Sequence, residues 1–182
     1  MIKSPMNYKK LANFMLFLAG WWTALLYGNA LALIALFVVL MLHFILWRDV
    51  RDIFIILVFI FCGFGIEWAF MASGVQDYRS NLPPAWVICI WAMLATIMRY
   101  SLSWLVNKPL WAALVGLLIA PVFYYNSVQF GPAGWSRPMW QCLLVISLVW
   151  GGLAAFISGV LVPIIEQMET VESSDPKNTV ER

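Results

Sequence analysis

The sequence is a series of apolar runs, most of them about 20 residues long, separated by short polar loops. The run Ile53–Ala72 (IFIILVFIFCGFGIEWAFMA) contains one carboxylate, Glu67, and no other run contains an acidic residue. A run of this length can cross a bilayer, and a spanning segment must satisfy its backbone hydrogen bonds internally. The sequence therefore predicts an all-α integral membrane helical bundle.

The composition supports one membrane domain. The chain is 63% hydrophobic and 11% charged, whereas about a quarter of the residues in soluble domains are charged. We expect a cytoplasmic N-terminus at residues 1–10, a single transmembrane domain at 11–165, and a polar, disordered cytoplasmic tail at 166–182. The net charge of +2 gives no reason to expect nucleic acid as a partner.

Turn signals divide the domain into six predicted transmembrane helices. Leu11–Leu46 is too long for one span, and its turn signal, Tyr27–Asn29, predicts a tight helical hairpin. Proline is tolerated in the first turn of a helix, so Pro84 and Pro109 mark helix starts. The four later helices are predicted at Ile53–Ala72, Pro84–Val106, Pro109–Phe130 and Met139–Ile165.

The distribution of basic residues predicts the orientation. With the N-terminus inside, only Arg79 and Arg137 lie on the outer side. Because Lys and Arg concentrate in cytoplasmic loops, both termini are predicted to be cytoplasmic. The inner side would hold Lys3, Lys9, Lys10, Arg48, Arg51, Lys108, Lys177 and Arg182.

Glu67 is the first candidate functional residue, because an acid within hydrocarbon is costly unless neutralised or paired. Gly63 and Gly65 beside it would let a helix or a ligand approach. The helical rise places Tyr124, Tyr125 and Asn126 at the same depth, so these groups are predicted to form a polar pocket with Glu67. Two interpretations remain open: a structural hydrogen bond, or a role in ligand binding, proton transfer or catalysis, with Tyr124 assisting.

Arg99 is the second candidate, because it also places a charge within an apolar run, where charge is costly in free energy. Thr96, Arg99 and Ser103 fall at i−3, i and i+4 and are predicted to share one helical face. His43 and Asn13 lie at a similar depth, which predicts a second polar cluster with Arg51 and Asp52 at its mouth. In the alternative, Arg99 extends to lipid phosphates and His43 bonds a neighbour. A direct Glu67–Arg99 ion pair is not expected, because their depths differ by about 10 Å.

Familiar catalytic signatures are absent from the sequence. It contains no HExxH or GxSxG motif, its three cysteines form no CxxC pair, and it has one histidine. We therefore predict no metal site and no cofactor.

The predicted helix Pro84–Val106 carries a recognisable pattern. Pro84-Ala85-Trp86, Trp91 and Ser101-Leu102-Ser103-Trp104-Leu105 resemble the P-x-W…W…S-L-x-W-L pattern of a bacterial multi-pass membrane family, domain of unknown function 2878. The resemblance extends from Leu11 to about Trp150. Its other parts, in order, are Asn13 with Trp21-Trp22, His43 followed by Arg51-Asp52, Gly63 four residues before an acid, Gly116 with Pro121 and Tyr124, and Trp150.

The resemblance implies a bacterial inner-membrane protein, in a family without an established activity. The family's usual acids are an aspartate at the position of Glu67 and a glutamate at that of Asp52, so each charge is kept here with its reach altered by one methylene. Family genes commonly neighbour those for cyclopropane-fatty-acid-synthase-like methyltransferases and other lipid-modifying proteins. The implied setting is membrane lipid metabolism.

These observations support three hypotheses of function. The first is a non-enzymatic or weakly enzymatic accessory component of lipid or fatty-acid modification, with membrane lipids and lipid-modifying enzymes as partners and room for a homo-oligomer. The second is a small proton-coupled transporter that uses Glu67. The third is a membrane-embedded lipid-modifying enzyme with Glu67 as general acid or base.

Overall fold

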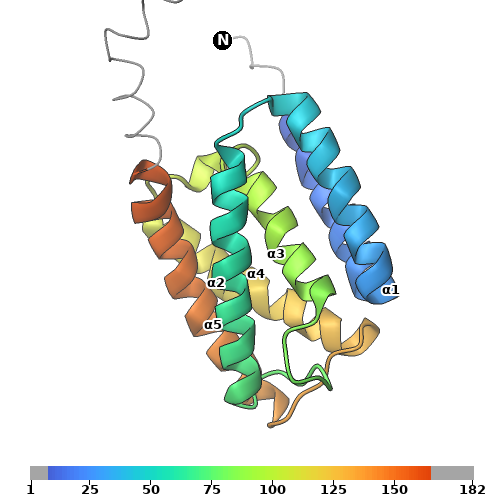
Figure 1. The fold of residues 1–182 in the computed structure, drawn as a ribbon. Helices are drawn as coiled ribbons and strands as arrows, with labels where there is room; N and C mark the ends of the chain where they lie inside the picture. Colours follow the sequence, from blue (N-terminus) through green and yellow to red (C-terminus); the bar gives the residue numbers. More distant parts are fainter. Residues whose placement is uncertain (1–7, 165–182) are drawn as a thin grey trace, which may run out of the picture.

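The computed structural model describes residues 8–164. The predicted C-terminal tail at 166–182 and most of the N-terminal segment lie outside the described residues. The described chain is all-α, as predicted, and forms five helices (Figure 1): α1 (Tyr8–Trp47), α2 (Asp52–Ala72), α3 (Ala85–Met98), α4 (Pro109–Phe130) and α5 (Met139–Phe156). A 3-10 turn η1 (Ser103–Leu105) follows α3, and a π-helical turn η2 (Ile157–Leu161) follows α5.

Helix α1 is divided at the predicted turn. Gly28 has a φ of 71° and a ψ of −157°, a conformation that glycine adopts without the strain a side chain would add. The two limbs run antiparallel on either side of it (Figure 1). The Asn29 Oδ1 accepts a hydrogen bond from the Trp86 backbone N–H, which ties the hairpin tip to the start of α3.

Four of the helices within residues 8–164 are long and apolar enough to cross a membrane: α1, α2, α4, and α5 continued to Ile164. These lengths and compositions are those of a multi-pass membrane protein. The helix α3 is shorter, with 14 residues. Its length corrects the prediction that this helix extends to Val106.

The helix α3 ends early because polar side chains bond outside the helical ladder. Ser101 Oγ donates to the Lys10 carbonyl and Ser103 Oγ donates to the Tyr100 carbonyl, so residues 99–108 form turns rather than a continuous helix. The prediction that Thr96, Arg99 and Ser103 share one helical face is therefore wrong. The hydropathy of this segment is helix-like, but its hydrogen bonding is not.

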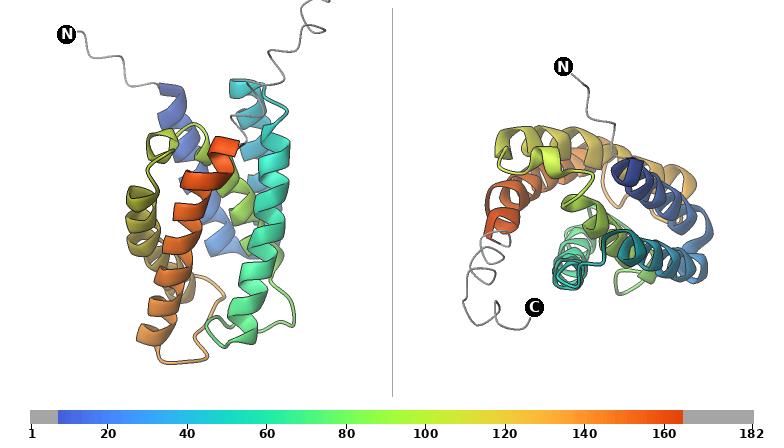
Figure 2. Two further views of the ribbon diagram at one scale, coloured as in Figure 1. Left: turned by 90° about the vertical axis from the view of Figure 1, so that its left-hand side faces the viewer. Right: turned by 90° about the horizontal axis from the view of Figure 1, so that it is seen from above.

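The helices pack as two groups. One is the α1–α3–α2 group, in which α3 lies along both α1 and α2; the other is the α4–α5 pair. Figure 2, viewed from above, shows α4 and α5 along one side of the molecule and α2 across from them. Aromatic side chains bridge the groups: Trp91 stacks on Trp150 with ring centroids 4.7 Å apart, and Trp21 meets Phe123 edge-on at 4.5 Å.

The two ends of the bundle differ in charge. The end that holds the loops before α2 and after α3 carries Lys9, Lys10, Arg48, Arg51, Arg99 and Lys108, and we call it the Arg99 end. The opposite end, with loops 73–84 and 131–138, carries Arg79 and Arg137, and we call it the Glu67 end. A short antiparallel bridge between Asp77 and Gly134 joins its two loops.

Candidate functional site

The carboxylate of Glu67 is buried between the two helix groups, with 2% of the residue exposed. Three side chains donate hydrogen bonds to it. Tyr78 Oη donates to Oε2 over 2.7 Å, Trp91 Nε1 donates to Oε1 over 2.9 Å, and Tyr124 Oη donates to the same Oε1. Trp150 Nε1 lies 3.3 Å from the Tyr124 hydroxyl and completes what we call the Glu67 cluster: Glu67, Tyr78, Trp91, Tyr124 and Trp150.

Each donor is positioned by local packing. The antiparallel helices α2 and α3 place Glu67 and Trp91 at equal depth, within two turns of the loop that joins them. The Trp91 ring lies against Gly63 so closely that a Cβ at that position would overlap it. Gly116 similarly admits the backbone of Trp150 against α4. Gly65, in contrast, has open space around its Cα, so the prediction of a close approach holds for Gly63 and not for Gly65.

Tyr78 reaches the cluster from the loop between α2 and α3. Its residue is 7% exposed, and its ring meets Trp86 edge-on. Burial, together with the charge of Glu67, raises the pKa of Tyr78 well above its ordinary value. The Tyr78 hydroxyl therefore keeps its proton at neutral pH and acts as a donor.

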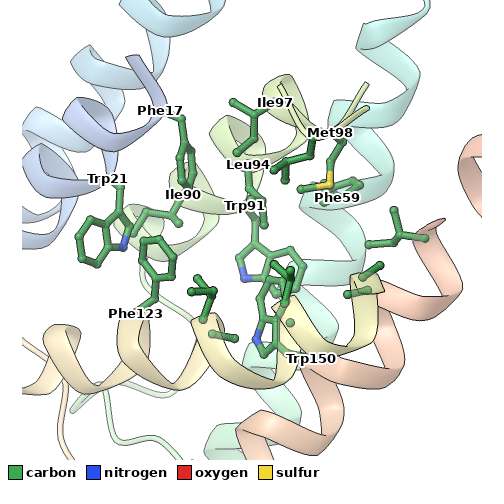
Figure 3. Close-up of a pocket in the computed structure, with 18 of the residues that line it drawn as sticks. Phe17, Trp21, Phe59, Ile90, Trp91, Leu94, Ile97, Met98, Phe123 and Trp150 are labelled. Atoms are coloured by element: carbon green, nitrogen blue, oxygen red, sulfur yellow. The ribbon is translucent and has the colours of Figure 1, made fainter. Parts of the chain in front are cut away.

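A cavity of about 330 Å³ opens beside this cluster, between the α1–α3–α2 group and the α4–α5 pair. Ten aromatic side chains line it, and Figure 3 shows Phe17, Trp21, Phe59, Trp91, Phe123 and Trp150 around the space. Glu67, Tyr78, Tyr124, Ser127 and Ser158 are the polar residues at its wall besides the tryptophans. The lining extends from Tyr78 near one end of the bundle to Val106 near the other.

A second polar cluster lies at the Arg99 end. Asp52, the first residue of α2, accepts hydrogen bonds from three side chains: Arg99 to Oδ1 over 2.8 Å, and Tyr100 and His43 to Oδ2 over 2.7 and 2.8 Å. Arg99 also pairs with Asp49 over 2.9 Å. His43 Nδ1 lies 3.5 Å from Asn13 Oδ1. We call Asn13, His43, Asp49, Asp52, Arg99 and Tyr100 the Arg99 cluster.

In the Arg99 cluster, one guanidinium lies between two carboxylates. Burial by itself lowers the pKa of Arg99, but its hydrogen bonds to Asp52 and Asp49, together with the charge of Asp52, outweigh burial and raise that pKa above its ordinary value. Burial, reinforced by Asp52, also raises the pKa of Tyr100. Arg99 therefore remains a cation and Tyr100 a neutral donor at physiological pH.

The structure brings some of the predicted residues together. It places Tyr124 on Glu67, and it places Asn13 and His43 in one cluster with Arg99, joined through Asp52. Tyr125 is 39% exposed on the outside of α4, and the side chains that donate to Glu67 within residues 8–164 are Tyr78, Trp91 and Tyr124, not Tyr125 or Asn126. Arg99 lies just after the end of α3, which corrects its predicted position within a longer helix, and it pairs with the carboxylates of Asp49 and Asp52.

Sequence reasoning missed several members of the clusters. Tyr78 lies in a loop for which the sequence predicts only polar character. Trp91 lies near a predicted helix end, which is typical of an interfacial anchor, but it is buried, with 3% of the residue exposed. The matching distances of Glu67 and Trp91 from the intervening loop were the available signal. In the Arg99 cluster, Asp49 and Tyr100 were missed because α3 was expected to continue past Arg99.

Long apolar helices and polar clusters buried between them define a multi-pass helical membrane protein. The chain belongs to the family described as protein of unknown function (DUF2878), whose model matches residues 10–156. Searches of curated proteins and of solved structures found no match.

The residues that carry the family resemblance converge in the fold. Trp91, Tyr124 and Trp150 meet at Glu67, and Gly63 and Gly116 admit the two tryptophans. At the other end, Asn13, His43 and Asp52 meet in the Arg99 cluster. Positions scattered over the sequence therefore form two sites.

Proposed function

We propose that this protein binds a membrane lipid, with an acyl chain in the cavity between the α1–α3–α2 group and the α4–α5 pair. The observation that carries the proposal is the cavity itself. Its volume of about 330 Å³ lies at the lower end of the range of about 300–1,000 Å³ found for small-molecule sites. That size suits one chain better than a whole phospholipid.

The apolar wall also argues for an occupant. Cavities cost about 24 cal/mol per Å³ when left empty, so a space of about 330 Å³ would cost several kcal/mol unless it were filled. Water gains little there, since it needs several polar partners. In a bilayer, a lipid acyl chain is the molecule available to occupy this cavity.

The proposed setting is the bacterial inner membrane, crossed six times with both termini in the cytoplasm. The basic residues at the Arg99 end support this orientation, since Lys and Arg favour the cytoplasmic side. Counting α1 as two spans at Gly28, and α3 as a short one, gives the six. A reporter fused after residue 76 should be outside the cytoplasm; a cytoplasmic reporter would overturn the topology.

Photolabelling tests lipid binding directly. The purified protein is reconstituted with a phosphatidylethanolamine whose acyl chain carries a diazirine, and the adducts are mapped by mass spectrometry. We expect adducts on cavity-lining residues such as Leu94 and Ile97. Ala120→Phe, which fills the cavity wall, should lower this labelling several-fold, whereas Leu118→Phe on the 62% exposed outer face should not. Adducts confined to the outer faces of wild type would contradict the proposal.

An accessory role in lipid modification rests on the family resemblance. We expect a deletion strain to show an altered fatty-acid or headgroup profile that wild type restores and Ala120→Phe does not. An unchanged profile would remove the link to lipid metabolism and favour the transporter hypothesis.

A further inference from the structure

The carboxylate of Glu67 has no cationic partner among the groups that bond it. Its three donors are two phenols and an indole, all neutral. Among the described residues that line the cavity, Glu67 supplies the one carboxylate, and none is a lysine, an arginine or a histidine. A charged form of this acid, away from water, is therefore stabilised by hydrogen bonds but not neutralised.

The hydrogen bonds of Glu67 leave room for a further contact. A carboxylate offers about four lone-pair positions. Oε1 accepts from Trp91 and Tyr124, and Oε2 accepts from Tyr78. One acceptor position on Oε2 is thus left, and Glu67 belongs to the cavity wall.

The rings around the cavity favour positive charge. The face of an aromatic ring carries partial negative charge and attracts ammonium groups, most strongly when these are desolvated. Trp91 is covered by Gly63 on one side and by Trp150 on the other, so the rings beside the acid that can meet a ligand are those of Trp150 and Tyr124, whose planes lie at 61° to each other. Aromatic faces together with one carboxylate are the chemistry that recognises quaternary ammonium groups and protonated amines.

We propose that the cavity selects a cationic amphiphile, whose ammonium group lies beside Glu67 against Trp150 and Tyr124 and whose alkyl chain occupies the apolar remainder. This inference rests on the proposed function, because it adds a headgroup preference to the binding of a chain. The alkyl chain of the ligand would extend from Glu67 towards Leu102 and Val106, where the cavity wall is apolar. The ammonium supplies the charge that the three neutral donors do not.

The experiment compares three ligands that share a dodecyl chain. Dodecyltrimethylammonium, dodecanol and dodecanoate are each titrated against the photolabelling of Leu94 and Ile97 by the diazirine lipid. We expect the cation to displace the label at about tenfold lower concentration than the alcohol, as a desolvated cation–π contact combined with a counter-ion would give. The anion should be the weakest of the three.

Variants of Glu67 identify the source of the preference. Glu67→Gln keeps the shape but not the charge, and it should bring the cation and the alcohol to equal potency. Glu67→Asp keeps the charge and should retain the preference. Thermal unfolding of each variant in detergent checks that it is folded, and the wild-type comparison of the three ligands tests the proposal even if a variant does not fold.

The outcomes separate the inference from the proposed function. If no dodecyl ligand displaces the label and the label avoids the cavity, both fail. If all three displace it with similar potency, or if dodecanoate is the strongest, the cavity binds chains and the cation preference is wrong. A preference that persists in Glu67→Gln would also overturn the role of this carboxylate.

Discussion

Asp52 and Glu67, the acidic residues near the two ends of α2, have similar hydrogen bonding but differ in whether a cation is among their donors. Asp52 and Glu67 each accept hydrogen bonds from three side chains, and each is at most 3% exposed. One donor to Asp52 is the Arg99 guanidinium, whereas all three donors to Glu67 are neutral. Asp52 is therefore half of an ion pair, and Glu67 can still take up a proton or a cation.

The surroundings of the two acids follow the same division. The Arg99 cluster joins three segments of the α1–α3–α2 group, and its residues are not part of the cavity wall. The Glu67 cluster joins that group to the α4–α5 pair and faces the cavity. We therefore propose that the Arg99 cluster stabilises the fold and that the Glu67 cluster serves the function.

Among the substitutions that test this comparison, removal of the Arg99 cation should lower the stability of the protein most. In Arg99→Met, the carboxylates of Asp49 and Asp52 lose their cationic partner while partly or fully buried. Breaking a buried pair in this way costs about 3–5 kcal/mol, and the side chain of Arg99 is only 13% exposed. We expect a much lower thermal midpoint in detergent, or no accumulation. Arg79→Met, an exposed arginine at the other end, is the control; equal effects of the two would show that the pairing adds no stability.

A smaller effect is expected when the Glu67 cluster is disturbed through its packing. Gly63→Ala places a Cβ against the Trp91 ring, which must shift and weaken its hydrogen bond to Glu67. Overpacking of this kind costs about 1–3 kcal/mol. Gly65→Ala, two residues away, meets open space and should gain up to about 1 kcal/mol from reduced backbone entropy. The measurement is the difference between the two thermal midpoints, and equal midpoints would contradict the close packing of Trp91.

The fold was largely predictable, because hydropathy and turn residues report helix lengths directly. The bounds of α4 agree with the prediction at both ends, and the turn at Gly28 lies where predicted. The early end of α3 was not predictable by hydropathy, since residues 100–106 are apolar enough to continue a helix. Ser101 donates to the backbone carbonyl of Lys10, a residue that only the folded chain brings near.

The candidate sites were predictable only in part. The helical rise predicted that Tyr124 lies near Glu67, because the depth of both residues could be measured from helix ends. Which of the adjacent Tyr124 and Tyr125 faces inward depends on the rotation of α4, and the sequence pattern of this helix carries little information about it. The donors Tyr78 and Trp91 depend on how a loop folds and on how closely Gly63 lets α3 approach.

The smallest effect on stability is expected from Glu67→Gln, the substitution that separates the two acids most clearly by function. The amide oxygen can accept from Trp91 and Tyr124, and the amide nitrogen can donate to the Tyr78 hydroxyl, so the hydrogen bonds are kept. We expect a change of about 1 kcal/mol or less, the net value of one neutral hydrogen bond. Thermal unfolding measures it, with Glu67→Ala as the contrast, because alanine leaves the indole and two phenols unpaired and should cost considerably more. If Glu67→Gln instead abolishes accumulation, as Arg99→Met is expected to do, Glu67 is a structural residue like Asp52 and the contrast between the two ends of α2 is wrong.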